Sequence, residues 1–129
     1  MLGKIKVNRD KKRLEVLVNI YELIDSYYKD LKQYRKSIRE SFSGRGLIAD
    51  EILEGRLPSV LLSEERSMLD SFMSKLKLCS YKESIDLTDA LLRKMHGVIV
   101  DLKEKVASHG KALPLVTGMI AFLIAILLF

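Results

Sequence analysis

The C-terminal stretch Ala112–Phe129 contains no charged side chain. As a helix it would rise about 27 Å, close to the roughly 30 Å thickness of a bilayer's hydrocarbon core. A buried helix of a soluble domain, the alternative, usually keeps one polar face. Here Thr117 is the only hydroxyl residue, and Pro114 stands where a first turn tolerates a missing N–H. The sequence therefore predicts a C-terminal transmembrane helix over residues 112–129.

Small residues recur along one side of this stretch. Thr117, Ala121 and Ala125 are spaced four apart, and Gly118 lies beside the first of them. Small side chains at this spacing let the backbone of another helix approach closely. The four residues are candidates for packing against a second membrane helix, although a tail rich in alanine and leucine also produces such a spacing by chance.

Lysines flank the uncharged stretch on one side only, at Lys103, Lys105 and Lys111. Positively charged residues beside a membrane helix stay on the cytoplasmic side, so the first 111 residues are expected to be cytoplasmic. The chain has one cysteine, Cys79, which excludes an internal disulfide and fits a reducing compartment. We expect Cys79 to be structural.

The residues before the membrane stretch predict an all-α domain. A first helix is expected from about Arg9 to Phe42, where the turn sequence SGRG at residues 43–46 would end it. A short second helix is expected over residues 47–54, followed by a break at the sequence GRLPS, residues 55–59.

Two longer helices are expected next. The third would begin at Ser63 as N-cap, with Glu64 and Glu65 at the positive end of its dipole. The fourth would begin at Ser80, whose partner Glu83 completes a capping box, and would run to about residue 106.

Apolar residues recur at helical spacing along these segments and predict the core. The stripe on the fourth helix is wide, which suits a globular bundle better than a two-stranded coil. We therefore expect a cytoplasmic antiparallel bundle of about four helices over residues 14–109, followed by the transmembrane helix. The expected core residues are Leu14, Leu17, Tyr21, Ile24, Tyr28, Leu31, Ile38, Phe42, Met68, Leu69, Phe72, Met73, Leu76, Ile85, Leu91, Leu92, Met95, Val98, Ile99, Leu102 and Val106.

The formal net charge of +5 is concentrated in residues 1–13, which we expect to form a basic N-terminal arm. No recognised nucleic-acid-binding fold or motif surrounds the cluster, so nucleic acid is not expected as a partner. Beside a membrane such an arm contacts anionic lipid, at about 1 kcal/mol per charge. A solvated leader is the alternative. The candidate lipid contacts are Lys4, Lys6, Arg9, Lys11, Lys12 and Arg13.

No residue cluster predicts catalysis. His96 and His109 are far apart in sequence, without Cys, Asp or Glu at metal-ligand spacing. No glycine-rich loop follows a strand, and no nucleophile is paired with a base. We therefore expect a protein that is not an enzyme, with no cofactor, no metal and no small-molecule substrate.

The chain resembles the stage III sporulation protein AB family of endospore-forming bacteria over roughly Leu62 to Phe129. That family has Leu-Gly and a Ser or Asp cap between its last two soluble helices; here Leu78, Cys79 and Ser80 stand there, with cysteine in place of glycine. A lysine, a glycine-containing stretch and a terminal Ile-Leu-Leu run follow in the family, and Lys111, Gly118 and residues 126–128 look like these. Family members usually begin with another membrane helix, whereas this sequence begins with a basic stretch.

The resemblance implies a non-catalytic assembly role in the complex that joins mother cell and forespore, at the mother-cell membrane. The family's soluble domain is similar to the cytoplasmic helical domain of type II secretion F proteins. Such a platform implies docking of a cytoplasmic ATPase, here stage III sporulation protein AA, besides other proteins of the complex. Charged residues off the apolar stripes are the docking candidates, expected to be exposed: Asp30, Lys32, Lys36, Glu64, Glu65 and Arg66.

Other classes remain open. A tail-anchored coiled-coil adaptor or fusion-type protein would also run directly into its anchor, but its coil carries a central Gln or Arg layer, and the fourth helix has Met95 near its middle. A small membrane-permeabilising protein of the holin type is a further alternative, for which a cytoplasmic domain of 111 residues is large.

Overall fold

The computed structural model describes residues 2–109, with the side chains of residues 8–107. These residues form five helices and no strand, which confirms the all-α class: α1 (Leu2–Tyr34), α2 (Ile38–Phe42), α3 (Leu47–Leu53), α4 (Ser63–Leu76) and α5 (Tyr81–His109). None of the helices within that part of the chain is long and apolar enough to cross a membrane. The expected transmembrane helix, including Thr117, Gly118, Ala121 and Ala125, lies outside the described residues.

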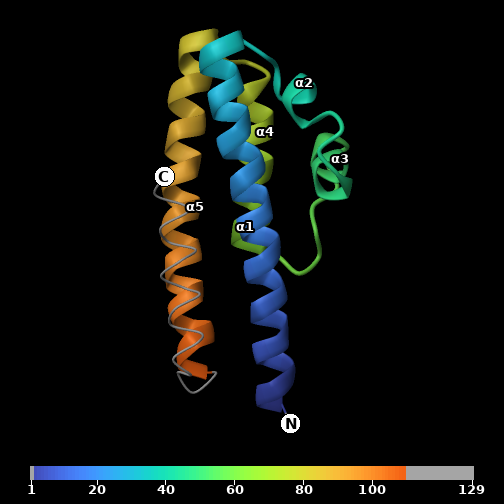
Figure 1. The fold of residues 1–129 in the computed structure, drawn as a ribbon, viewed down its shortest axis with the longest axis vertical. Coiled ribbons are helices and arrows are strands. Elements are labelled where there is room, and N and C mark those ends of the chain that lie inside the picture. The colour runs from blue at the N-terminus through green and yellow to red at the C-terminus, as the bar shows by residue number, and fades with distance from the viewer. Residues whose placement is uncertain (1, 110–129) are drawn as a thin grey trace.

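The long helices α1 and α5 form an antiparallel pair that carries most of the core (Figure 1). Leu17, Ile20 and Ile24 of α1 are fully or almost fully buried, as are Met95 and Ile99 of α5. Their spacing of three or four residues keeps them on one face of each helix, so the two apolar faces close on one another. Ile20, which lies off the expected stripe, is a core residue that the sequence analysis missed.

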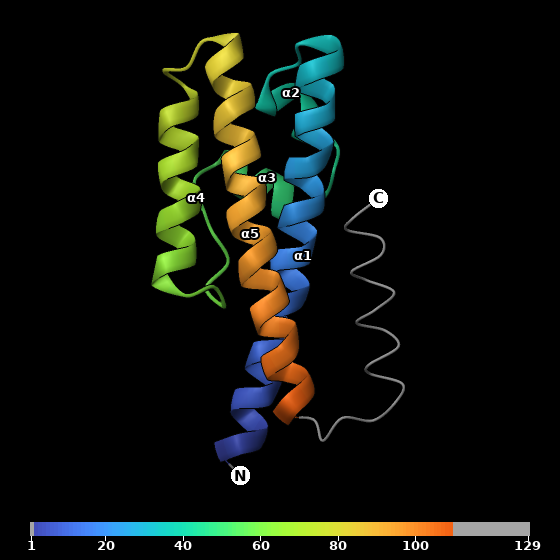
Figure 2. The same ribbon diagram turned by 90° about the vertical axis from the view of Figure 1, so that its left-hand side faces the viewer.

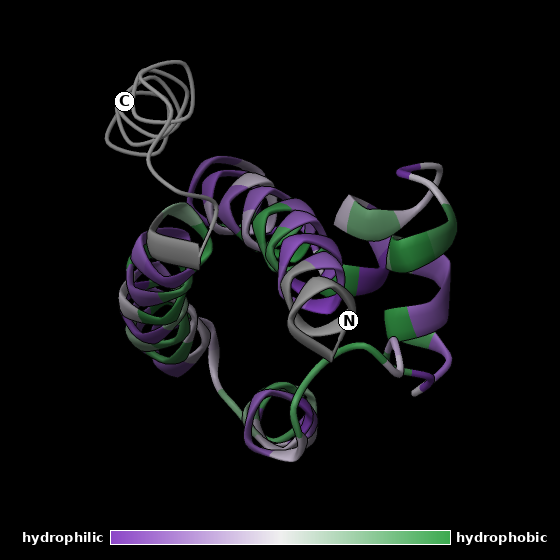
Figure 3. Ribbon diagram, turned by 90° about the horizontal axis from the view of Figure 1, so that it is seen from below, coloured by the Kyte–Doolittle hydropathy of each residue, from purple (hydrophilic) through white to green (hydrophobic). Residues whose placement is uncertain are grey.

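The shorter helices cover the two sides of this pair. The helix α4 packs on α5 (Figure 2), whereas α2 and α3 pack on α1, on the side away from α5 (Figure 3). We call the end where α1 begins and α5 ends the basal end. The opposite end, where α1 ends and α5 begins, is the distal end.

The first helix does not continue to Phe42, and that expectation is wrong. It ends at Tyr34, because Arg35 adopts a left-handed conformation with φ of 54° and its N–H donates to Leu31 O over 3.0 Å. A residue other than glycine pays roughly 1–2 kcal/mol for this conformation. Ser37 then starts α2 by accepting from Glu40 N at 3.2 Å, while the Glu40 carboxylate accepts from Ser37 N at 3.5 Å.

The other boundaries agree closely with expectation. The helix α3 fills the expected segment, and α5 begins after Ser80, whose Oγ accepts from Glu83 N at 3.3 Å. The N-cap of α4 is Leu62, one residue before the expected Ser63.

The basic stretch expected as a separate arm is helical from Leu2 onward and belongs to α1.

The contribution of this packing can be measured with one substitution at two sites. Leu17→Ala removes a fully buried side chain (0% exposed) and should lower the free energy of unfolding by about 2–5 kcal/mol. Leu78→Ala is the matched control, because Leu78 is 89% exposed and the same change should cost less than about 0.5 kcal/mol. Urea unfolding of the full chain in mild detergent, followed by circular dichroism, measures both. An equal loss of unfolding free energy in the two variants would contradict the burial of Leu17 between α1 and its neighbours.

Candidate functional site

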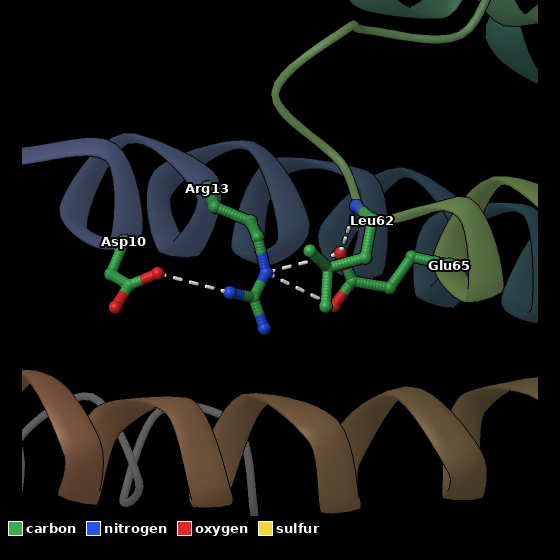
Figure 4. Close-up of polar contacts among 4 residues, drawn as sticks. All are labelled: Asp10, Arg13, Leu62 and Glu65. Atoms are coloured by element: carbon green, nitrogen blue, oxygen red, sulfur yellow. Dashed lines mark hydrogen bonds and ion pairs between the residues drawn. The ribbon is translucent and has the colours of Figure 1, made fainter. Parts of the chain in front are cut away.

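A buried ion-pair network joins α1 to the start of α4 near the basal end (Figure 4). The guanidinium of Arg13 lies between two carboxylates. Its Nε donates to both oxygens of Glu65 at 3.1 and 3.2 Å, and its Nη1 donates to Asp10 Oδ1 at 3.1 Å. We call Asp10, Arg13 and Glu65 the clasp. It holds two segments together that lie 52 residues apart in the sequence.

Glu65 has two structural roles. Besides binding Arg13, its Oε1 accepts from Leu62 N at 2.9 Å and so satisfies a backbone donor at the N-terminus of α4. Its negative charge also lies at the positive end of the helix dipole. Glu65 is only 4% exposed, so the expectation of an exposed docking residue at this position is wrong.

Among the described side chains, two polar atoms near the basal end are buried without a hydrogen-bond partner: Asp10 Oδ2 and Lys103 Nζ. Lys103 is 1% exposed, so it is not the surface charge that its position beside the membrane stretch suggested. Burial lowers the pKa of its ammonium group, because the protonated form loses its hydration without gaining an ion-pair partner. A buried cation without a partner among the described side chains therefore works against folding at this end of the bundle.

The expected lipid contacts divide into three groups. The side chains of Lys4 and Lys6 lie outside the described part. Arg9, Lys11 and Lys12 are exposed, whereas Arg13 is engaged in the clasp and is not a surface charge. The basal end thus presents three described cations from about one turn of α1.

The structure does not bring the expected docking residues together. Lys32 and Lys36 are exposed at the distal end of α1, while Glu64 and Arg66 are exposed at the start of α4. Asp30 is half-buried: its Oδ2 accepts from Ser41 Oγ at 2.8 Å and lies 3.9 Å from Arg45 Nη2. Asp30 therefore attaches the segment around α2 to α1.

The remaining chemical groups do not converge. No three His, Cys, Asp or Glu side chains of the described residues are arranged to hold a metal ion. Cys79 lies in the turn between α4 and α5, and the ring of His96 lies 6.5 Å from that of Tyr21. Cys79 and His96 are separated by more than four turns of α5, about 22 Å, which is too far for a nucleophile and its base.

Comparison with known proteins finds no protein-family model, no curated protein and no solved structure that matches the chain.

The burial of Glu65 and the burial of Lys103 each have a signal in the sequence. Glu65 stands three residues after Leu62, where a carboxylate reaches back to the N-cap backbone, as Glu83 does for Ser80. Lys103 stands four residues after Ile99 and three before Val106, which is the spacing of the core stripe. No pattern in the sequence indicated that Arg13 would meet Glu65, since that contact depends on how α4 packs.

Removing only the cation of the clasp should destabilise the fold more than replacing all three charged residues together. Arg13→Met leaves the buried carboxylates of Asp10 and Glu65 without their cation and should cost about 3–5 kcal/mol. Arg13→Met combined with Asp10→Asn and Glu65→Gln keeps an acceptor for Leu62 N and should recover much of that loss. Urea unfolding of all variants measures the coupling. An equal loss in the single and the triple variant would contradict a charge-based clasp.

The buried Lys103 should make stability rise at alkaline pH. Between its lowered pKa and the ordinary value of 10.5, the unfolded chain holds a proton that the folded chain releases, so folding becomes more favourable as pH rises. Below that window the cost of the buried charge is present in full. Lys103→Met should therefore raise the melting temperature at neutral pH, corresponding to about 1–3 kcal/mol, and its advantage should shrink toward pH 10.5. Lys94→Met, at an exposed position of the same helix, should show neither effect.

Proposed function

We propose that this chain is a membrane-anchored, non-catalytic assembly protein. Its helical domain stands at the cytoplasmic face of a bacterial cell membrane and acts as a platform for a cytoplasmic ATPase. The setting is the complex that joins mother cell and forespore, on the mother-cell side, with stage III sporulation protein AA as the ATPase. The sporulation setting rests on the resemblance of residues 62–129 to the AB family.

The observation that carries the membrane part of the proposal is the antiparallel arrangement of α1 and α5 (Figure 1). It brings the exposed cations Arg9, Lys11 and Lys12 to the same end as the C-terminus of α5. The uncharged stretch begins at Ala112, three residues after α5 ends. An anchor at that end would hold these cations next to lipid headgroups, where each contributes about 1 kcal/mol on an anionic surface.

The arrangement of the helices supports a platform over a coiled-coil adaptor. Two helices, α2 and α3, cover α1 on the side away from α5, and α4 covers α5. Phe42, Ile52 and Phe72, one from each of these shorter helices, are buried. Since the apolar faces are satisfied within one chain, the fold does not need a second coil to bury them.

The membrane part predicts how the full chain fractionates. It should sediment with membranes and resist both high salt and alkaline carbonate, because its attachment is hydrophobic. Ile120→Lys with Leu123→Lys places two charges in the uncharged stretch and should move the protein to the soluble fraction. Ala121→Ile with Ala125→Ile is the matched control: it keeps the stretch apolar, so insertion should persist. Release of the parent protein by carbonate would overturn the anchor.

The platform part is tested separately by co-purification of the proposed ATPase, stage III sporulation protein AA, with the solubilised full chain. We expect a complex with the parent protein and the Ala121→Ile, Ala125→Ile variant alike, since the docking surface belongs to the helical domain. A membrane-bound protein that ignores the ATPase and forms parallel oligomers would favour the coiled-coil adaptor instead.

A further inference from the structure

A groove opens at the distal end, where the segment around α2 meets the end of α4 and the start of α5. Its volume is about 670 Å³. Half-buried and buried apolar side chains form its floor: Tyr27, Leu31, Ile38, Leu53, Met73 and Leu76. We call it the distal groove. Its floor is apolar enough to receive the side chains of another helix.

The rim of the distal groove is basic. Arg35, Lys36, Arg39 and Lys77 line it and are exposed, against the single carboxylate of Glu40. The Glu40 Oε1 accepts from Ser37 Oγ at 3.1 Å, and the four rim cations outnumber its one negative charge. An occupant with negative charges beside its apolar face would therefore be attracted, and a basic one repelled.

Two exposed apolar residues lie next to rim residues in the sequence, although neither lines the distal groove itself. Tyr34, which precedes Arg35, is 63% exposed, and Leu78, which follows Lys77, is the most exposed large apolar residue among those described. The main core is complete without either side chain. Exposed apolar groups rimmed by polar ones are characteristic of surfaces that contact other proteins.

Arg35 links the groove to a strained backbone position. Its left-handed φ of 54° suits glycine, yet an arginine stands there, with its guanidinium carbon 4.3 Å from the centre of the Tyr81 ring. A strained residue of this kind persists only where the surrounding structure fixes it, and such residues gather at functional sites. Here the strain directs a cation to the rim of an apolar groove.

We propose that the distal groove binds an amphipathic helix of a partner protein, with apolar residues on one face and carboxylates along its edges. The identification of this occupant as the docking element of the cytoplasmic partner rests on the proposed function. Apolar residues at positions i, i+3 or i+4 and i+7 would enter the groove, and the carboxylates would meet the four rim cations. Lys36 is the one expected docking residue that belongs to this surface.

The position of the groove argues for a protein occupant and against lipid. With 29 residues, α5 is about 43 Å long, and it separates the groove from the basal end. Lipid headgroups at a membrane anchored through the basal end would lie beyond the reach of Lys36 or Lys77. The cations at the two ends thus have different partners. Arg9, Lys11 and Lys12 at the basal end would contact lipid headgroups, and the rim cations at the distal end would contact carboxylates of the partner helix.

The test uses the full chain in neutral detergent and a fluorescent synthetic helix of about sixteen residues, with leucine at helical spacing and glutamate elsewhere. A second peptide replaces every glutamate with lysine. The parent protein should bind the acidic peptide saturably, with affinity that falls as salt rises, and should bind the basic peptide at least about tenfold more weakly.

Charge reversal at either end supplies matched variants. Lys36→Glu, Arg39→Glu and Lys77→Glu together should weaken binding of the acidic peptide at least about tenfold and improve binding of the basic one. The same number of reversals at the base, Arg9→Glu, Lys11→Glu and Lys12→Glu, should change peptide binding less than about twofold. All six residues are exposed, so both proteins should fold. An equal effect of the two triple variants would overturn the proposal.

Arg35→Gly provides a variant with an undisturbed fold. Glycine adopts the left-handed backbone without strain, so the melting temperature should stay close to that of the parent protein. Peptide affinity should nevertheless fall about three- to tenfold, since the cation over Tyr81 is lost.

Two outcomes would contradict a protein-binding groove. One is unchanged affinity of the Arg35→Gly variant for the acidic peptide. The other is capture of anionic phosphatidylglycerol vesicles by the parent protein that the distal triple variant abolishes. These outcomes are independent of carbonate extraction, which tests the anchor alone.

Discussion

The packing of α1 against α5 determines where everything else in this molecule lies. Each of the shorter helices is attached mainly to one member of the pair, α4 to α5 and both α2 and α3 to α1. Because the pair is antiparallel, the start of the chain and the end of α5 share one end of the bundle. The same constraint brings Tyr81, the first residue of α5, to Arg35 just after the end of α1. The Tyr81 hydroxyl donates to Lys32 O at 3.2 Å. The packing of α1 against α5 therefore positions both the exposed cations of the basal end and the distal groove.

The interior near the base holds charges that are only partly compensated. In the clasp, Arg13 binds both Asp10 and Glu65, which leaves one net negative charge, and Lys103 is buried without a hydrogen-bond partner among the described residues. Replacing a buried ion pair by apolar residues of the same size often leaves stability unchanged or raises it, so stability alone does not account for the clasp. We infer that its directional bonds set the height at which the start of α4 lies along α1. No comparable bonds compensate Lys103 among the described residues, so the surrounding apolar packing must offset the free energy lost by burying its ammonium group.

Local sequence signals predicted three of the five described helices closely, α3, α4 and α5, but not the end of α1, the separate helix α2 or the long-range contacts. The Ser80–Glu83 capping box and the apolar stripe through Met95 and Ile99 predicted α5 correctly, because caps and periodicity act within a few turns. The end of α1 was predicted wrongly because the apolar spacing continues through Ile38, although the Ser37–Glu40 capping box marks the restart. The burial of Glu65 and the assembly of the distal groove depend on contacts between segments far apart in sequence, for which periodicity carries no information.

The unbroken course of α5 has a mechanical consequence. A helix without proline is stiff, so over its length of about 43 Å α5 would move as one rod. Tilting such a rod by ten degrees about its middle moves each end by about 4 Å, in opposite directions. A force applied around Tyr81 would therefore reach residue 109 as a sideways displacement. Mechanical work done on the distal end of the protein would, through this one helix, become lateral movement next to the uncharged stretch.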